Sequence, residues 1–376
     1  MRRIASHYAL VNGVLERGIV VEIDDCGTIT QISRPENLDS VASVEFHPGI
    51  LIPGMINTHC HLELSYLRGT IAESTGFAGF AREIGRVRGG YSDEERLHAA
   101  SIADSAMWHE GVEAVADIAN DALVMPIKEN SKIEYHTLFE VFGLMTQLSD
   151  LQKSIATQYK NSGITVHSTY SLQDRLFKSI AQQGNEPLSI HFLESDDEID
   201  LYHHQGSLWE WYARMGWQCD FLHYAHPAQR IIASVPKERA TMVVHNCKAT
   251  AEVVKMLNSH FTTPVTWVLC PESNRYISGL TPPIDMLRKM GAQIAIGTDS
   301  LASTRHLSMI ENMRLLGDIP LEELLTYATI NGAKALGIDD KKGTIEVGKQ
   351  PGLAIISGVD LHKIQLTKDS ICTRIV

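Results

Sequence analysis

The sequence lacks the features that mark secreted, membrane-spanning or nucleic-acid-binding proteins. Its 376 residues contain six cysteines, none in a C-x-x-C pair, which argues against a disulfide framework or a thiolate zinc site. No apolar run reaches the roughly 18 residues of a membrane span, and the first residues lack the apolar core of a signal peptide. The net charge of −12 and the lack of a dense Lys and Arg cluster disfavour a nucleic-acid partner. We expect a cytoplasmic protein with a small-molecule ligand.

Several catalytic motifs are also absent or incomplete. Neither the G-x-S-x-G turn of serine hydrolases nor the H-E-x-x-H helix of zinc proteases occurs. The His-x-Glu of cytidine-type zinc deaminases is matched by His61 and Glu63, but the Pro-Cys-x-x-Cys that supplies their other ligands is missing. Residues 343–350 nearly form a phosphate-binding loop, yet Gln350 replaces the required hydroxyl and Pro351 prevents a helix, so we expect a hairpin there.

What the sequence does contain is a regular alternation of apolar strand candidates and helical stretches. The strand candidates are 51–58, 114–118, 133–142, 164–168, 188–192, 241–245, 265–269 and 293–297. Eight such units in order predict an α/β fold, a (β/α)8 TIM-like barrel over residues 51–338. Short strands also occupy residues 1–50, with an Asn12-Gly13 hairpin turn, and 339–376. We expect the two chain ends to form one small β-sandwich domain.

Four of the predicted barrel strands end in a histidine or an aspartate. His59 and His61 share one strand face, because side chains alternate with a period of two. His191, His245 and Asp299 end the fifth, sixth and eighth strands, at the face where such barrels carry their active sites. Taken singly, the histidines could be core residues and Asp299 could cap a following helix. Together they indicate a metal site, because imidazole and carboxylate are good zinc ligands.

The order and spacing of these motifs resemble the amidohydrolase superfamily, and within it the mononuclear-metal deaminase and chlorohydrolase branch. The resemblance covers nearly the whole chain and rests on residues 53–61, His167-Ser168-Thr169-Tyr170, His191-Phe192-Leu193-Glu194, His245, Cys270-Pro271-Glu272-Ser273-Asn274, Gly297-Thr298-Asp299-Ser300 and residues 328–337. The residues around the first pair of histidines are most similar to aminodeoxyfutalosine deaminases, followed by adenosylhomocysteine and methylthioadenosine deaminases. Thr304-Arg305 departs from the Asn-rich stretch of many relatives, which leaves the substrate open.

The resemblance implies a role for each motif residue. The implied ligands of one divalent metal ion, zinc as first choice and iron as the alternative, are His59, His61, His191 and Asp299. Glu194 would protonate a ring nitrogen, His245 would stabilise the tetrahedral centre, and Asp299 would also act as a base. A second metal is not expected, because residues 164–168 offer no lysine of the kind that bridges two metals in binuclear relatives.

Four further residues are candidates for holding the substrate: His167, Tyr170, Glu63 and Ser303. His167 and Tyr170 lie at the mouth of the fourth strand, but could instead close a layer of the barrel. Glu63 shares the face of the ligand histidines if the first strand continues, and is otherwise a solvated loop carboxylate. Glu194 requires a turn after His191, because in a regular strand it would face the other way.

Residues 195–237, between the fifth and sixth strands, form a long connection that is rich in aromatic side chains. Long connections at this end of a barrel often cover the site, where aromatic rings could stack on a planar base. The spacing also fits a helix that buries its own apolar side, which we favour. Phe77, Phe80 and Arg82 are further candidates for contacting the far end of a substrate.

These observations predict a metal-dependent hydrolytic deaminase that releases ammonia from an aminated purine or a nucleoside-like heterocycle. A chlorohydrolase, or a deaminase of a pterin or triazine ring, is the enzymatic alternative. From a different class, the chain could be a catalytically silent barrel that acts as a binding module, although intact candidates at every ligand position argue against this. The expected partner is a small-molecule substrate, with no nucleic acid and no membrane. The sequence leaves open whether the protein forms a homodimer.

Overall fold

Two four-stranded parallel sheets form the centre of the molecule. The computed structural model describes residues 1–36, 43–148 and 155–376. Within these residues, one sheet contains β6 (Met55–Cys60), β7 (Val112–Ala119), β8 (Glu134–Val141) and β9 (Ser162–Val166), and the other contains β10 (Leu188–Phe192), β11 (Thr241–His245), β12 (Thr266–Leu269) and β13 (Gln293–Ile296). Parallel bridges between Ser168 and His191 and between Cys60 and Asp299 join the two sheets at both seams. The strands therefore follow one another around a closed ring.

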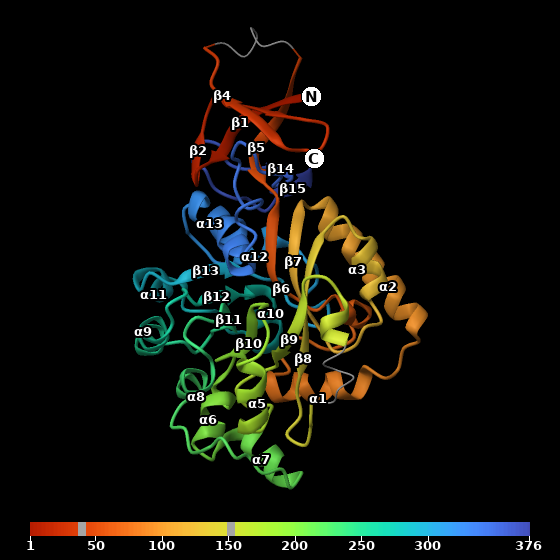
Figure 1. Cartoon of the computed structure of the whole chain (residues 1–376), viewed down its shortest axis with the longest axis vertical. Helices are drawn as coiled ribbons and strands as arrows, with labels where there is room; N and C mark the ends of the chain where they lie inside the picture. Colours follow the sequence, from red (N-terminus) through yellow and green to blue (C-terminus); the bar gives the residue numbers. More distant parts are fainter. Residues whose placement is uncertain (37–42, 149–154) are drawn as a thin grey trace.

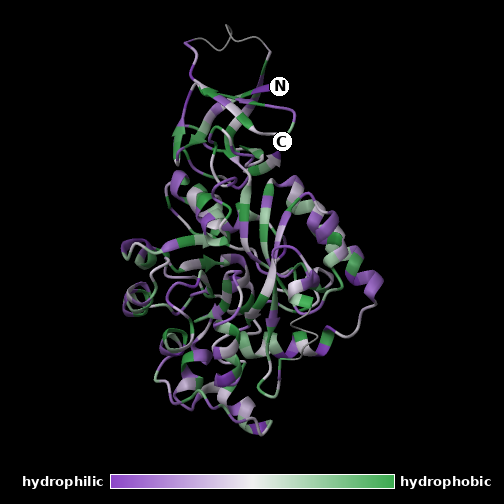
Figure 2. Cartoon of the chain, in the orientation of Figure 1, coloured by the Kyte–Doolittle hydropathy of each residue, from purple (hydrophilic) through white to green (hydrophobic). Residues whose placement is uncertain are grey.

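Most residues of the ring strands are buried, although their side chains point alternately to the two faces. All eight residues of β7 and all five of β10 and β11 are buried, as expected for parallel strands covered by helices. Figure 2 shows mostly hydrophobic residues along these central strands and many hydrophilic residues on the surrounding helices. Close approach at one seam depends on Gly297, because a Cβ there would lie 2.7 Å from the Cβ of His59.

Helices follow most of the ring strands and cover the ring. They are η2 (Leu62–Leu67, a 3-10 helix), α1 (Phe77–Val87), α2 (Asp93–His109), α3 (Met125–Asn130), α5 (Asp174–Ala181), α6 (Asp196–Tyr202), α7 (Gly206–Arg214), α8 (Pro227–Ser234), α9 (Ala251–His260), α10 (Pro271–Ser278), α11 (Ile284–Lys289), α12 (Met309–Leu315), α13 (Leu321–Ala328) and α14 (Ile330–Leu336). Local sequence sets several of their ends. Ser92 and Glu95 form a capping box at the start of α2, and Gly279 ends α10 in a left-handed conformation. Among the described residues, no helix combines the length and apolar character needed to cross a bilayer.

The two ends of the chain share a second sheet. Among the described residues it has seven strands, in the order β15 (Ile371–Arg374), β14 (Leu353–Ser357), β5 (Val44–Pro53), β1 (Arg2–Val11), β3 (Val20–Ile23) and β4 (Ile29–Ser33), with β2 (Val14–Glu16) paired to β1. The β1–β2 hairpin turns at Asn12 and Gly13, both with positive φ, which confirms the predicted turn. Figure 1 shows this terminal sheet, with both chain ends, at one end of the molecule and helices α1, α6 and α7 at the opposite end.

Two segments differ from the sequence prediction. Residues 51–53, expected in the first barrel strand, instead complete β5 of the terminal sheet, where Leu51 pairs with Ala9 and Ile355. The chain passes from one sheet to the other at Gly54, where a Cβ would lie 2.7 Å from a backbone oxygen. Residues 343–348 were expected to form a strand and hairpin, but only Ile345 is bridged, to Val11. Ile345 is fully buried there and Val347 is exposed, so one apolar side chain packs into the protein without strand pairing of its neighbours.

Candidate active site

A cavity of about 360 Å³ opens at the carboxyl ends of the ring strands. Its lining includes His61 after β6, His191 in β10, Glu194 after β10, His245 at the end of β11 and Asp299 after β13. The end of the ring that carries α1 and α7 also holds this cavity, because both helices contribute to its wall. The residues singled out at strand ends therefore meet in one place, as parallel strands in a ring require.

Three histidines form a group that could hold a metal ion. His59, His61 and His191 each offer a ring nitrogen within 4.8 Å of the others, and all three are buried. Both ring nitrogens of His59 lack a hydrogen-bond partner, an unusual state for a fully buried polar side chain. Burial, and then the neighbouring His191, lowers the pKa of His59 well below its usual range, which keeps the imidazole neutral. Neutral imidazole is the form that binds metal.

Backbone hydrogen bonds hold these imidazoles in place. The Nδ1 of His191 lies 2.8 Å from the carbonyl oxygen of His167, so this nitrogen carries the proton and Nε2 is left as an acceptor. The carbonyl of His59 accepts hydrogen bonds from the amides of Thr298 and Asp299, both at 2.9 Å. The first and eighth ring strands are thereby tied together beside the histidine group.

Asp299 is the carboxylate next to this group. Its Oδ1 lies 3.8 Å from Nε2 of His61 and accepts a hydrogen bond from the amide of Ser300 at 2.7 Å. Its Oδ2 accepts from the hydroxyls of Ser273, at 2.6 Å, and Ser303, at 3.2 Å. Burial acts to raise the pKa of Asp299, but His61 and the other nearby groups outweigh it, so the pKa is lowered and the carboxylate stays ionised. Residues 300–304 form a turn and no helix, so Asp299 does not cap one.

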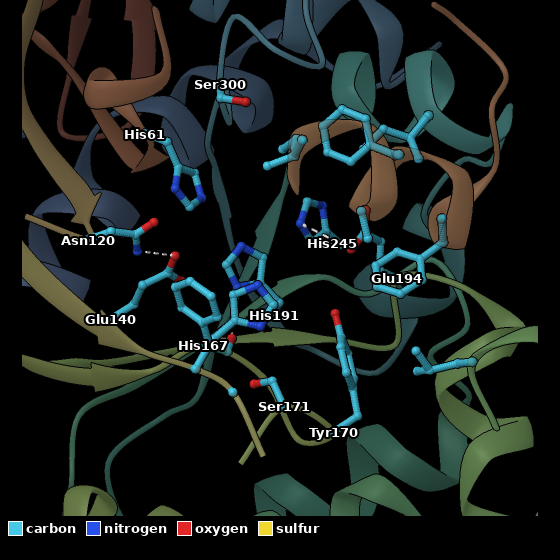
Figure 3. Close-up of a pocket in the computed structure, with 18 of the residues that line it drawn as sticks. His61, Asn120, Glu140, His167, Tyr170, Ser171, His191, Glu194, His245 and Ser300 are labelled. Atoms are coloured by element: carbon cyan, nitrogen blue, oxygen red, sulfur yellow. Dashed lines mark hydrogen bonds and ion pairs between the residues drawn. The ribbon is translucent and has the colours of Figure 1, made fainter. Parts of the chain in front are cut away.

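Glu194 and His245 face each other across another part of the cavity. Leu193 has a φ of 49°, so the chain bends directly after β10 and turns Glu194 inward, as its predicted role requires. Glu194 Oε2 lies 3.8 Å from His245 Nε2 (Figure 3). Burial, with Asp299 and Glu198 adding to it, raises the pKa of Glu194 well above its usual range, which favours the protonated acid. Burial lowers the pKa of His245 to about 3.

The four substrate candidates occupy different positions. His167 stacks on His191 with ring centroids 4.5 Å apart and lines the cavity, as does Tyr170, whose hydroxyl is buried without a partner. Glu63 does not line the cavity: the first strand ends at Cys60, and η2 places the Glu63 carboxylate against the amide of Asn120, at 2.9 Å. Ser303 does not line it either, and holds Asp299 instead.

The sequence analysis missed several polar residues of this site. Glu140 is the next-to-last residue of β8 and lines the cavity together with Asn120, whose side-chain amide donates to Glu140 Oε1 at 2.7 Å (Figure 3). The Nδ2 of Asn274 lies 3.0 Å from Nδ1 of His245, and the carboxylate of Glu198 accepts from the amide of Leu193 at 2.6 Å. Two of these residues carried a usable signal: Glu140 lies near the end of a predicted strand, where the ligand candidates also lie, and Asn274 belongs to one of the motifs that carry the resemblance.

Aromatic side chains form the outer wall of the cavity. Trp211, Tyr212 and Trp217, from the long connection after β10, line it beside Phe77 and Phe80 of α1. The same connection also packs on itself around buried Leu201, Tyr202, Leu208 and Phe221. The segment therefore both contributes to the cavity wall and buries its own apolar side chains. The arginine in the lining is Arg88, in place of the expected Arg82.

A ring of parallel strands whose carboxyl ends hold a histidine and carboxylate cluster is the arrangement of a metal-dependent hydrolase. The chain belongs to the Amidohydrolase family, whose model matches residues 50–374. It is a hydrolase of the deaminase and chlorohydrolase branch, acting on C–N bonds other than peptide bonds.

Known proteins similar to this chain are named as nucleoside deaminases. The adenosine deaminase of Helicobacter pylori is 27% identical over 365 residues, covering 91% of this chain and 86% of the relative. The 5-methylthioadenosine/S-adenosylhomocysteine deaminase of Halalkalibacterium halodurans is 25% identical over 375 residues, covering 92% of this chain and 80% of the relative.

Solved structures share the fold. Helicobacter pylori aminofutalosine deaminase in complex with methylthio-coformycin superposes with a TM-score of 0.83 at 24% identity, covering 98% of this chain and 94% of the other. An adenosine deaminase from Xanthomonas campestris with bound zinc superposes with a TM-score of 0.76 at 20% identity, covering 97% and 86%.

Proposed function

We propose that this protein is a mononuclear metal-dependent deaminase that replaces the exocyclic amino group of an adenine-type nucleoside by oxygen and releases ammonia. The observation that carries the proposal is the meeting, at one cavity, of the His59, His61 and His191 group with Asp299, whose pKa is lowered, and Glu194, whose pKa is raised. The names of the similar deaminases support an adenine-type substrate. The aromatic wall of Trp211, Tyr212 and Trp217 is suited to a planar base.

The residues present fit one divalent metal ion. His59, His61, His191 and Asp299 would hold it, because His59 has two unsatisfied buried nitrogens and His191 presents Nε2 with its other nitrogen already bonded. Imidazole and carboxylate suit zinc, and also iron. When bound, the ion supplies a water that ionises near neutral pH. Residues 164–168 contain no lysine for a second metal.

The side chains around this position divide the proton transfers of the reaction. Glu194, held protonated by its buried environment, donates to ring nitrogen N1 and makes C6 electrophilic. Asp299 accepts a proton from the attacking water as the C6–O bond forms. His245 hydrogen-bonds the oxygen at the tetrahedral carbon and stabilises it. Glu194, now a carboxylate, takes the proton of the new C6 hydroxyl and passes it to the amino group, so the C6–N bond breaks, ammonia leaves and the 6-oxo product remains. Asp299 then loses the proton it took from the water and Glu194 regains one, by exchange with solvent.

The domain organisation that we propose follows the prediction, with residues 1–50 and 339–376 as a small β-sandwich domain and residues 51–338 as the metal-dependent (β/α)8 barrel, except that residues 51–53 move to the terminal sheet, where β5 ends. The shared terminal sheet and the ring of parallel strands support it.

Metal analysis and a substrate panel test the proposal. The purified protein is expected to hold about one zinc or iron per chain, and a His59→Ala, His61→Ala double variant to lose it. The zinc-loaded protein is expected to release ammonia from adenosine-type nucleosides, followed by ultraviolet absorbance, and to do little to dihydropyrimidines. If only dihydropyrimidines are turned over, the deaminase proposal is wrong. If only a chlorotriazine or a pterin is turned over, the result favours the alternative enzymes. If no compound is turned over although metal is present, the result favours a catalytically silent barrel.

A further inference from the structure

Glu140 presents an unsatisfied carboxylate oxygen to the cavity. The residue is 8% exposed at the end of β8, and its Oε2 is buried without a hydrogen-bond partner. The other oxygen, Oε1, accepts from Asn120 Nδ2 at 2.7 Å. A buried carboxylate oxygen without a donor is costly, so this position calls for a ligand that brings hydrogen-bond donors.

The neighbouring side chains fix Glu140 in this position. The backbone amide of Asn120 donates to Glu63 Oε2 at 2.9 Å, and its side-chain oxygen accepts from Arg88 Nη2 at 2.9 Å. Because Asn120 is held at both ends, its amide must donate to Glu140 and cannot be exchanged for the carbonyl. Arg88 also lines the cavity, and its side chain is 33% exposed.

The location of Glu140 relative to Glu194 identifies which part of a nucleoside reaches it. In a 6-aminopurine, N1 and the sugar-bearing N9 lie on opposite edges of the ring system as seen from C6. With C6 at the histidine group and N1 at Glu194, the sugar falls on the other side of His191. Figure 3 shows Glu140 and Asn120 on that side and Glu194 on the opposite side.

We infer that Glu140 binds the vicinal hydroxyls of the substrate's ribose, so that the site selects ribonucleosides over deoxynucleosides and free bases. This inference rests on the proposed function. A carboxylate oxygen with free lone pairs accepts two hydroxyl hydrogens, and such charge-assisted bonds are the strong ones. Glu140 is thus a specificity-determining residue on the opposite side of His191 from the acid.

A cation is the competing occupant, because ligand atoms of Glu140, His167 and His191 also lie within 4.8 Å of one another. The Nδ1 of His191 is engaged by the carbonyl of His167, which leaves only Nε2. His191 also belongs to the group with His59 and His61, where the same free nitrogen would have to serve. One imidazole nitrogen binds one ion, so a second metal at Glu140 would compete with the first, whereas a diol would not.

Steady-state kinetics of the metal-loaded protein test the inference, with adenosine, 2′-deoxyadenosine and 3′-deoxyadenosine as substrates. In the unaltered protein, loss of either hydroxyl is expected to lower kcat/KM by ~10- to 100-fold, the range for a hydrogen bond to a charged group. In Glu140→Gln, kcat/KM for adenosine falls by a similar factor, and the deoxynucleosides lose little more. Glu134→Gln, the same change at the other end of β8 and outside the cavity, is expected to keep the full discrimination.

Two outcomes would overturn the inference: unchanged discrimination in Glu140→Gln, or a metal content that falls from two ions to one per chain in that variant. Binding of inosine and 2′-deoxyinosine, measured by calorimetry, separates this inference from the proposed function. Selective binding of inosine that Glu140→Gln removes, without turnover of any nucleoside, would disprove the deaminase and keep the ribose site. Binding of neither compound, with no turnover, would disprove both.

Discussion

Single residues at this site take their chemical state from their surroundings. Glu194 lies among buried groups that favour its neutral acid form, whereas Asp299, supported by two hydroxyls and a backbone amide, stays ionised. Two carboxyl groups lining the same cavity can therefore perform opposite proton transfers.

Glu194→Gln is expected to retain the metal while kcat falls by roughly a hundredfold or more, the usual size of a general acid–base contribution. The amide is nearly the same size as the acid, so the cavity keeps its shape, but it cannot donate the required proton. Steady-state assays of ammonia release measure kcat, and elemental analysis measures the metal content. Turnover near that of the unaltered protein would remove Glu194 from the mechanism.

The residues at strand ends could be predicted because strand periodicity and ring topology fix where they lie. The positions of the strand-end residues could be predicted without knowing how the loops fold, and these residues are His59, His61, His191 and Asp299. Glu63 was placed on the ligand face by extending the strand period beyond Cys60, where the chain in fact turns into η2. The contacts of Asn120 and Asn274 depend on how distant loops fold against each other, which local patterns do not contain.

At the scale of elements, the short helix α6 holds the turn that carries Glu194. Glu198, on α6, accepts hydrogen bonds from the amide of Leu193 and the hydroxyl of Thr169, and so joins the ends of β9 and β10. Leu193 has positive φ, a conformation that costs free energy and needs such support. Glu198 is therefore a positioning residue for the acid.

Glu198→Ala is expected to lower the free energy of unfolding by ~2 kcal/mol, because two buried donors lose their acceptor. It should also lower kcat about tenfold or more through misplacement of Glu194, with KM and metal content changed less. Glu198→Gln, which keeps an acceptor oxygen, should restore part of kcat. Glu210→Ala, on the exposed face of α7, is the control. A loss of stability with kcat unchanged would show that Glu198 only supports the fold.

Strands and turns were predicted best where the sequence pattern allowed only one interpretation. The eight ring strands and the hairpin at Asn12 and Gly13 are of this kind. Residues 51–53 were misplaced because one apolar run continues through two strands, and only Gly54 marks the change of sheet. Composition cannot locate the boundary, since the end of β5 and the start of β6 are both buried and apolar.

At the scale of the whole molecule, a polar contact joins the terminal sheet to the ring. Arg374 of β15 lies over the ring of Trp108 and donates to Glu113 of β7 at 2.8 Å, and Lys342 donates to the same carboxylate at 2.6 Å. All of these groups lie outside the cavity lining. The contact should therefore stabilise the protein without entering its chemistry.

Arg374→Ala is expected to reduce the free energy of unfolding by about 3 kcal/mol, because it leaves a buried carboxylate with one cation in place of two and removes a packed side chain. Urea denaturation with zinc held at saturation measures this change, and kcat should stay within about twofold. Lys237→Ala removes one side of an exposed ion pair and should change the stability by about 0.5 kcal/mol or less. An equal, small effect of both variants would contradict the role given to Arg374.

The terminal sheet also sets an order of events during synthesis. β5 pairs with β1 on one side and with β14 on the other, yet β14 follows the whole ring of strands in the sequence. While the ring is being translated, the edge of β5 that carries buried, apolar Ile50, Leu51 and Ile52 has no partner. An open apolar strand edge is a template for pairing with another chain. A nascent chain stalled before residue 353 should therefore be prone to aggregation, and a ribosome that translates rapidly through residues 339–376 shortens the time at risk.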